Sequence, residues 1–285
     1  MSVINTNVSA LYSQNAMKTN ARAMSTAMEQ LSTGTRVNSA KDDAAGLAIG
    51  QNMTSQIRGL NQAVRNVNDG INMMQTAEGA MVEQSNMLQR MRELAVQAMN
   101  GTYSDVQRGY LNKEFQELAE QIGDIAKDTM WNDQSLLTGS GGATSNGVFT
   151  FQAGQGAAQT ISVNVDAMTV TGLNLVAVGS SVASGINIAT GNGASGALGL
   201  ISSALETINL QRAEIGAGIN RMAYAADNLT NIASNQTQSR SSIMDTDYAL
   251  ATTQLAKTQI IQQAATAMLA QANQQPQAVM ALLKG

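Results

Sequence analysis

The 285-residue sequence contains no cysteine and no histidine. Disulfides, thiolate nucleophiles, imidazole acid–base catalysis and the usual zinc ligand sets are therefore excluded. Proline occurs once and aromatic residues make up 3% of the chain, whereas 17 methionines accompany abundant Ala, Leu, Ile and Val. This composition favours long helices over a compact enzyme core, so we expect a mainly α-helical protein that is not an enzyme and holds no metal or cofactor.

Charge of either sign is also sparse, at 13% of residues with a formal net charge of −4. A nucleic-acid partner is not expected, because phosphate binding needs a clustered basic face that the sequence lacks. No apolar run approaches membrane-spanning length, and the first twenty residues lack the basic and apolar segments of a signal peptide. We therefore expect no membrane insertion, and any export must use a route that reads no such signal.

Apolar residues recur at alternating spacings of three and four in three long stretches, which is typical of helices packed in a bundle. The stretches cover residues 57–99, 111–125 and 198–232. Gly101 suits a helix C-cap between the first two, which together predict a helical hairpin. Three polar residues occupy positions on the first seam: Glu78, Ser85 and Arg92.

The segment 139–196 differs in composition, because Gly, Ser, Thr, Ala and Asn dominate and Asp166 is its only charged residue. Alternating apolar residues in "VFTFQ" and "TISVNV", with a glycine-containing turn between them, predict a β-hairpin. The stretches "MTVTGLNLVAV" and "GINIAT" predict further strands. The middle of the chain is therefore expected to form a small β-containing segment.

Both chain ends carry apolar stripes with few charges. Met17, Met24 and Leu31 recur near the N-terminus, and Ile261 and Met268 recur near the C-terminus. A single isolated helix of this kind is poorly stable in water. The two ends are therefore expected to pack against each other or against other copies of the chain.

Four motifs resemble those of bacterial flagellin. They are "INTNVSAL" at 4–11, "NSAKDDAAGLAI" at 38–49, "RMRELAVQAMNGT" at 90–102 and "ANQQPQAVMALLKG" at the C-terminus. The resemblance covers both ends of the chain and omits the middle, where flagellins differ in length and fold. This chain resembles a short form without large outer domains.

The resemblance implies a filament subunit that is exported through the flagellar type III apparatus and polymerises outside the cell for motility. The implied partners are other copies of the chain, an export chaperone, and the cap and hook-junction proteins. It also implies an inner helical domain of residues 1–37 and 245–285, a long-helix domain of 38–137 and 197–244, and a variable segment, 138–196. The residues expected to pack the inner domain are Leu11, Met24, Leu31, Ile261 and Met268.

The helix around "LQRMRELAVQ" carries a second candidate surface. At 100° per residue, Arg90, Glu93 and Gln97 point away from the seam and Leu94 lies on their flank. This pattern is typical of a solvated helix face with one exposed leucine. The resemblance instead implies a surface recognised by the vertebrate innate immune receptor for flagellin, made of four residues: Gln89, Arg90, Leu94 and Glu114.

The stretch "VNSAKDDAAGLAIG" places Asp42 and Asp43 beside Lys41. Asn38 or Ser39 can cap a helix, and the two carboxylates would then complement the helix dipole in the first turn. Small residues after them would allow close approach of another helix. The resemblance implies that this region joins the inner and outer helical domains and contacts neighbouring subunits through Asn38, Lys41, Asp42 and Asp43.

Two other functions are compatible with the sequence. A hook–filament junction protein shares related terminal helices, and a secreted helical protein could bind membranes or host surfaces through its apolar ends. The lack of Lys and Arg on the polar faces argues against lipid binding.

For a filament subunit, we expect folding of the ends to be coupled to assembly, because only neighbouring copies complete their packing.

Overall fold

The computed structural model describes residues 7–142, 145–175 and 186–283, with side chains described to residue 274. The chain divides into two compact units, Met1–Ile57 with Ser234–Gly285, and Arg58–Ala233. The helix α2 (Ala44–Met99) and the helix α4 (Gly191–Met244) contribute residues to both units. The inner, outer and variable domain boundaries expected from the sequence differ from this division and stay a prediction.

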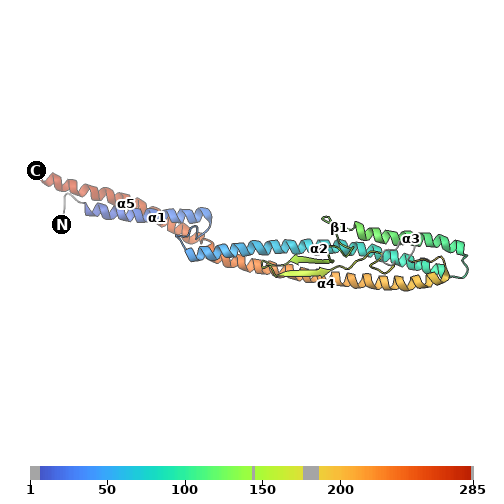
Figure 1. Ribbon diagram of the computed structural model, residues 1–285. Helices are drawn as coiled ribbons and strands as arrows, with labels where there is room; N and C mark the ends of the chain where they lie inside the picture. The colour runs from blue at the N-terminus through green and yellow to red at the C-terminus, as the bar shows by residue number, and fades with distance from the viewer. Residues whose placement is uncertain (1–6, 143–144, 176–185, 284–285) are drawn as a thin grey trace. The chain divides into compact units, whose positions relative to one another are not determined.

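In the first unit, α1 (Val8–Thr33) and α5 (Tyr248–Leu283) lie side by side, as the blue and red helices of Figure 1 show. The Asn7 side chain caps α1 by accepting a hydrogen bond from the Ala10 N–H at 3.0 Å. The helix ends at Gly34, whose φ of 70° lies in the left-handed region. The two chain ends therefore form a helical pair.

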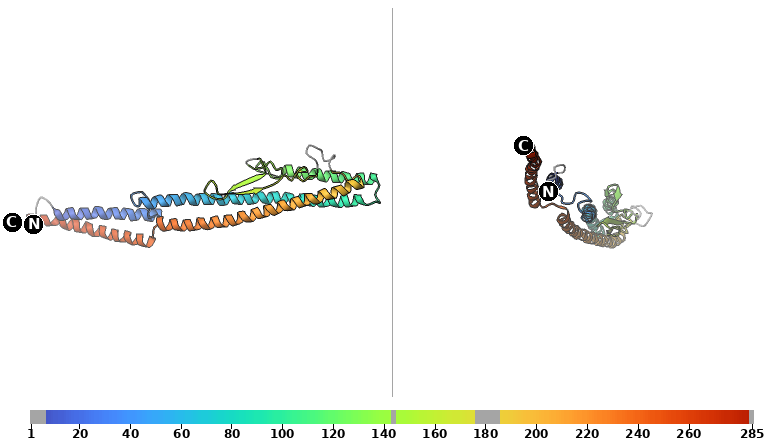
Figure 2. Two further views of the ribbon diagram at one scale, coloured as in Figure 1. Left: turned by 60° about the horizontal axis from the view of Figure 1, so that its bottom comes forward. Right: turned by 90° about the vertical axis from the view of Figure 1, so that its left-hand side faces the viewer.

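The second unit packs α2, α3 (Asp105–Asp128) and α4 around a main apolar core, and a smaller apolar cluster joins α2 to α4 (Figures 1 and 2). A capping box starts α3: Ser104 Oγ accepts from the Gln107 N–H at 3.4 Å, and Gln107 Oε1 accepts from the Ser104 N–H at 2.9 Å. The mainly α-helical fold and the helical hairpin predicted from the apolar spacing are confirmed.

A β-hairpin packs on these helices. Strand β3 (Val148–Gln152) pairs antiparallel with β4 (Thr160–Asn164), and Phe149 faces Val163 across the pair. Phe149, Ile161 and Val163 are buried, so the alternation seen in the sequence gives the inward face. The predicted hairpin is confirmed.

The sequence did not predict the short hairpin of β1 (Met130–Trp131) and β2 (Gln134–Ser135). Its turn residues Asn132 and Asp133 both have positive φ, 48° and 62°. Two left-handed residues in a two-residue loop are the requirement of a type I′ turn, which Asn and Asp tolerate. The dipeptide Asn-Asp between two short polar-apolar runs was the available signal.

The prediction of further strands in the middle segment is wrong for the residues that the structure describes. Residues 168–175 form bends and turns or have no regular structure, and residues 186–190 form no strand. The remaining parts of the two stretches, 176–178 and residue 185, lie outside the described residues. The helix α4 also begins at Gly191, six residues before the expected start at 197.

The seam predicted on α2 is confirmed at its central positions Met74, Met81 and Leu88, but the buried face extends beyond it. On α2, Gln84, Met91 and Leu94 are buried, whereas Arg92 and Met99 are exposed. Residues of α3 and α4 join the same core, so the buried face of α2 is wider than a two-helix seam. Two of the polar seam residues remain near the core: Ser85 is buried, and Glu78 lies 3.6 Å from Arg212 of α4.

Candidate assembly surfaces

The contact between α1 and α5 is made of small and polar residues. Ala10, Ala27 and Ala251 are buried there. The buried Asn20 side chain donates to the Thr258 carbonyl oxygen at 2.7 Å and to Gln262 Oε1 at 3.3 Å. A polar residue in a helix seam fixes register at a cost in stability. The helical pair is therefore specified by Asn20 rather than strongly stabilised by apolar packing.

The large apolar residues of the pair lie on its surface. On α5, Leu250 is 71% exposed and Met268 is 65% exposed. At 3.6 residues per turn, Leu250, Ile261 and Met268 fall within about 20° of one another and about a quarter turn from the buried Thr258. We call the exposed apolar residues of the pair the terminal apolar surface: Val8, Leu11, Tyr12, Met28, Tyr248, Leu250, Ile260, Ile261 and Met268.

The residues expected to pack the inner domain divide into two groups within one subunit. Met24 and Leu31 are partly buried. Leu11, Ile261 and Met268 are 51%, 40% and 65% exposed. These three residues therefore do not pack between α1 and α5 within one subunit, because small residues occupy that contact. Packing against other copies stays a prediction.

Residues 34–43, together with 244–247, form a dense polar connection in the first unit, which we call the joint. The Arg36 N–H donates to the Met244 carbonyl oxygen at 2.6 Å, and the Thr246 N–H donates to that of Gly34 at 3.0 Å. The Arg36 guanidinium also donates to the Ile243 carbonyl at 2.6 Å and lies 3.9 Å from Asp43 Oδ2. Arg36 thereby satisfies the C-terminal carbonyls of α4.

The cap of α2 is Asp43, not Asn38 or Ser39 as the sequence suggested. Its Oδ1 accepts a hydrogen bond from the Gly46 N–H at 2.8 Å, which is the bond of an N-cap residue. A Cβ on Gly46 would collide with the Asp43 carboxylate. The sequence predicts that small residues here let another helix approach. Gly46 has a role within the chain as well, because it leaves room for the Asp43 carboxylate that caps α2.

Asp42 holds the turn before the helix. Its Oδ2 accepts from the Ser39 N–H and the Ser39 hydroxyl, both at 3.0 Å, and from the Asn38 N–H at 3.3 Å. Desolvation acts to raise its pKa, but these Ser39 and Asn38 hydrogen bonds and the charge of Lys41 lower the pKa of Asp42 overall. The structure thus brings Asn38, Lys41, Asp42 and Asp43 into one turn, with Lys41 exposed.

On the second unit, Arg90 of α2 joins two carboxylates. Its guanidinium lies 2.9 Å from Glu93 Oε2 and 3.0 Å from Glu114 Oε1 of α3, and all three side chains are about half exposed or more. The hydrogen bonds to Glu93 and then to Glu114 raise the pKa of Arg90. The structure therefore brings Arg90 and Glu114 together, with Gln89 exposed beside them.

Leu94 does not belong to this exposed surface. It is 1% exposed, inside the core of the second unit. The expectation of one exposed leucine on a solvated face is therefore wrong. Core residues of α3 such as Phe115 and Ala119 widen the buried face of α2, which a seam drawn for one partner helix does not include.

Two buried glutamines, Gln84 and Gln211, have roles that the sequence did not predict. Gln84 donates to the carbonyl oxygens of Ile122 and Met168 at 3.1 Å and 3.0 Å. Gln211 donates to the Asn164 carbonyl at 2.8 Å and accepts from the Asp166 N–H at 3.2 Å. Each ties a segment without regular structure to a helix. Their position at heptad spacing from buried apolar residues was the available signal.

Comparison with protein families supplies the decisive observation. The model of the bacterial flagellin N-terminal helical region matches residues 4–141, and that of the C-terminal helical region matches residues 198–283. The chain belongs to the bacterial flagellin family. Neither region includes residues 142–197 of this flagellin.

Relatives match this flagellin over almost its whole length. A flagellin of Halalkalibacterium halodurans is 42% identical over 282 residues, covering 99% of this chain and 100% of the relative. The flagellar filament 31.3 kDa core protein of Treponema maltophilum is 39% identical over 287 residues, with 99% and 100% covered. Flagellin B of Vibrio anguillarum is 35% identical over 371 residues, with 98% and 99% covered.

The described part of this flagellin contains neither a membrane-spanning helix nor a metal-binding cluster. None of its helices combines the length and the hydropathy needed to span a bilayer. No group of three or more His, Cys, Asp or Glu residues lies in a position to hold a metal ion. The candidate surfaces described above are the terminal apolar surface, the joint and the Arg90–Glu114 ion pair.

Proposed function

We propose that this flagellin is a structural subunit of the bacterial flagellar filament, outside the cell, and that its terminal apolar surface makes the contacts between copies. The supporting observation is that the α1–α5 pair exposes its large apolar residues instead of burying them. Small and polar residues lie between the helices, while Leu250, Ile261 and Met268 lie outside. A large apolar surface on a subunit indicates an interaction site.

Burial of this surface supplies the driving force for assembly. Apolar area removed from water contributes about 25 cal/mol per Å², so a stripe along a long helix provides a substantial free energy of association. When one face of a subunit binds a different face of the next copy, each added subunit is rotated relative to the last. The copies form a closed ring only if these rotations add up to a full turn, and otherwise they form an open helical filament. The terminal pair therefore suits an open filament.

A pair of matched variants tests this role. Ile261→Asn with Met268→Asn should prevent or strongly reduce polymerisation, because both side chains are exposed in the subunit and contribute to the surface. Val106→Asn with Tyr110→Asn is the control, since both residues are 66% exposed on α3. Sedimentation of seeded samples measures the polymer. Normal polymer from the terminal variant, or equal loss in both, would contradict the role of the surface.

We further propose that the helical pair is completed by assembly. The contact between α1 and α5 buries few large side chains, so neighbouring copies should supply much of its stability. Limited proteolysis of dilute subunit and of polymer tests this. We expect cleavage within residues 8–33 and 248–274 in the subunit and protection in the polymer. Equal protection in both states would overturn the coupling.

The joint is proposed to set the geometry of assembly. Asp42 and Asp43 order the turn that leads into α2, and Arg36 ties this turn to the end of α4. Asp42→Ala with Asp43→Ala should therefore give filaments of altered form or poor motility. Normal filaments and normal motility would count against this role.

Other proteins are proposed to cover the terminal apolar surface before assembly and at the filament ends. A large apolar surface is prone to aggregation in the cell, which an export chaperone would prevent. At the two ends of a filament, subunits lack one set of neighbours, so cap and hook-junction proteins would meet the same surface. Coprecipitation with the terminal variant and its α3 control would distinguish this surface from the rest of the chain.

Recognition by the vertebrate flagellin receptor is proposed for the exposed part of the predicted surface, Gln89, Arg90 and Glu114, without Leu94. The ion pair holds Arg90 and Glu114 together on adjacent helices. Arg90→Ala should weaken receptor signalling. Arg92→Ala is the matched control and should leave signalling unchanged, because Arg92 is an exposed arginine of the same helix that is not part of the proposed surface. Unchanged signalling by the Arg90 variant would remove the assignment.

A further inference from the structure

Three asparagines in the sequence are followed by glycine, at 100–101, 146–147 and 192–193. Glycine lacks a side chain, so its backbone nitrogen can approach the preceding asparagine side chain closely. The structure distinguishes the three pairs by what holds that nitrogen. We propose that Asn100 is a site of spontaneous modification, deamidating to aspartate and isoaspartate, and that Asn146 and Asn192 are protected.

The reaction needs only water. The Gly101 backbone nitrogen loses its proton and forms a bond to Cγ of Asn100. The bond from Cγ to the side-chain nitrogen breaks, and the nitrogen leaves as ammonia with the proton. Water then opens the resulting succinimide ring at either carbonyl. One opening gives aspartate, and the other gives isoaspartate, with no oxidation or reduction at any step.

Contacts around Asn100 favour the first step. Its side-chain oxygen accepts from the Thr102 N–H at 3.3 Å, which draws electron density from Cγ. Its backbone carbonyl oxygen accepts from the Tyr103 N–H and from Arg108 Nη2, both at 3.3 Å. That carbonyl shares its peptide bond with the Gly101 nitrogen, so two donors on it make the N–H more acidic.

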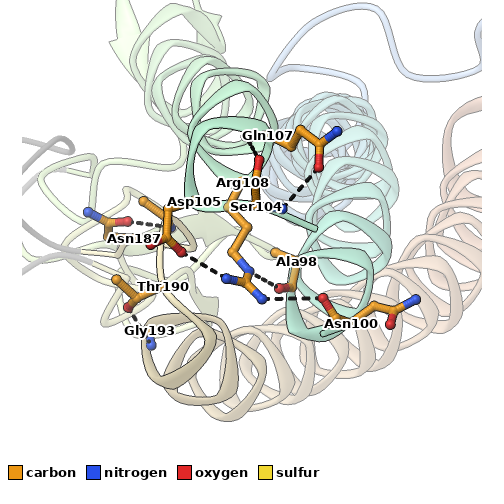
Figure 3. A network of polar contacts seen from close by, with 10 residues as sticks. Ala98, Asn100, Ser104, Asp105, Gln107, Arg108, Asn187, Thr190 and Gly193 are labelled. Atoms are coloured by element: carbon orange, nitrogen blue, oxygen red, sulfur yellow. Dashed lines mark hydrogen bonds and ion pairs between the residues drawn. The ribbon is translucent and has the colours of Figure 1, made fainter. Parts of the chain in front are cut away.

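Arg108 is held in place for this contact, as Figure 3 shows. Its Nε donates to the Ala98 carbonyl oxygen at 2.8 Å, and Nη1 lies 2.9 Å from Asp105 Oδ1. Its side chain is 15% exposed. The guanidinium is therefore fixed at the end of α2 by groups on both sides of the turn, with its third nitrogen directed at Asn100.

The Gly101 nitrogen is also accessible. The residue is exposed, and an added Cβ there would meet no atom within 4 Å. Among the hydrogen bonds of the described residues, none uses the Gly101 N–H as donor. The ring can thus form without displacing a neighbour or breaking a backbone bond.

The other two pairs lack this freedom. The Gly147 N–H donates to the Gly141 carbonyl oxygen at 3.0 Å, in a buried position. The side-chain oxygen of Asn146 accepts a hydrogen bond from the Val148 N–H at 3.2 Å, as that of Asn100 does from the Thr102 N–H. The two pairs therefore differ in the glycine nitrogen and not in this bond. The Gly193 N–H donates to Thr190 Oγ1 at 3.2 Å in the first turn of α4 (Figure 3). In both pairs the attacking nitrogen is already bonded.

Incubation of the full chain in mildly alkaline buffer, followed by peptide mapping, tests the proposal. Isoaspartate is detected by enzymatic transfer of a labelled methyl group to its carboxylate. We expect aspartate and isoaspartate at position 100 to form several-fold faster than at 146 or 192. Equal rates at the three sites, a faster reaction at 146 or 192, or no product at 100 would overturn it.

Two variants separate the chemistry from general flexibility. Gly101→Ala adds a side chain in open space, so it should preserve the fold and slow deamidation of Asn100 several-fold. Thr190→Val removes the acceptor of the Gly193 N–H and should accelerate reaction at Asn192 while leaving Asn100 unchanged. If Gly101→Ala has no effect on Asn100, or Thr190→Val none on Asn192, the assignment of the attacking nitrogens is wrong.

Discussion

Asp42 and Asp43 are adjacent carboxylates that hold different backbone groups. Asp43 accepts from the Gly46 N–H inside the first turn of α2, whereas Asp42 accepts from Asn38 and Ser39 before the helix. The sequence predicted negative charge near a helix start, which is general electrostatics. It could not predict which residue caps the helix, because that depends on where the preceding turn closes.

Loss of the cap should be measurable at one residue. Asp43→Ala should destabilise the start of α2 by about 1 kcal/mol, the usual cost of removing an N-cap side chain. Asp43→Asn keeps an acceptor oxygen and should retain most of this stability. Amide hydrogen exchange of Gly46 measures the effect. Equal exchange rates in the wild type and Asp43→Ala would show that Asp43 is not the cap.

Acid should weaken the turn that Asp42 holds. The pKa of Asp42 is lower in the folded chain than its ordinary value, so its contribution to stability is present above the ordinary carboxyl pKa and is lost as the pH falls through the lowered pKa. Asp42→Asn removes this contribution. The difference in urea midpoint between wild type and variant should therefore be largest at neutral pH and shrink in acid. A constant difference would refute the linkage.

Elements were predictable where one pattern decided them. Spacings of three and four gave the long helices, and strict alternation at Phe149, Ile161 and Val163 gave the larger hairpin. The faces of the helices were less predictable, because a third element shares the core. Leu94 lies outside a two-helix seam, yet it is buried by the packing of α2 with α3 and the rest of the core.

Two glycines of α2 should respond oppositely to the same change. A Cβ at Gly70 would lie 2.8 Å from the Phe151 ring of β3, whereas a Cβ at Gly79 would meet nothing within 4 Å. Gly70→Ala should destabilise the second unit by about 2 kcal/mol through overpacking. Gly79→Ala should stabilise it by about 0.5–1 kcal/mol, since alanine restricts the unfolded chain.

Chemical unfolding followed by tryptophan fluorescence measures both variants, because Trp131 of β1 is the only tryptophan and lies in the second unit. Shifts of the same sign for Gly70→Ala and Gly79→Ala would contradict the account of how the hairpin packs on α2.

At the scale of the whole molecule, the sequence predicted that the apolar chain ends need partners. The motifs at both ends predicted the family, which the matches over residues 4–141 and 198–283 confirm. The sequence did not show that the α1–α5 contact itself consists of small residues, Asn20 and Thr258. Periodicity identifies an apolar stripe, but not whether it faces its own chain or another copy.

Seeded polymerisation followed by electron microscopy shows whether this flagellin is a subunit that assembles through its chain ends. Short filament fragments are added to purified full-length subunit, and filament length is followed with time. We expect long filaments from the wild type and little elongation by Ile261→Asn with Met268→Asn. Seeds that fail to grow with wild-type subunit, or grow equally with the variant, would contradict it.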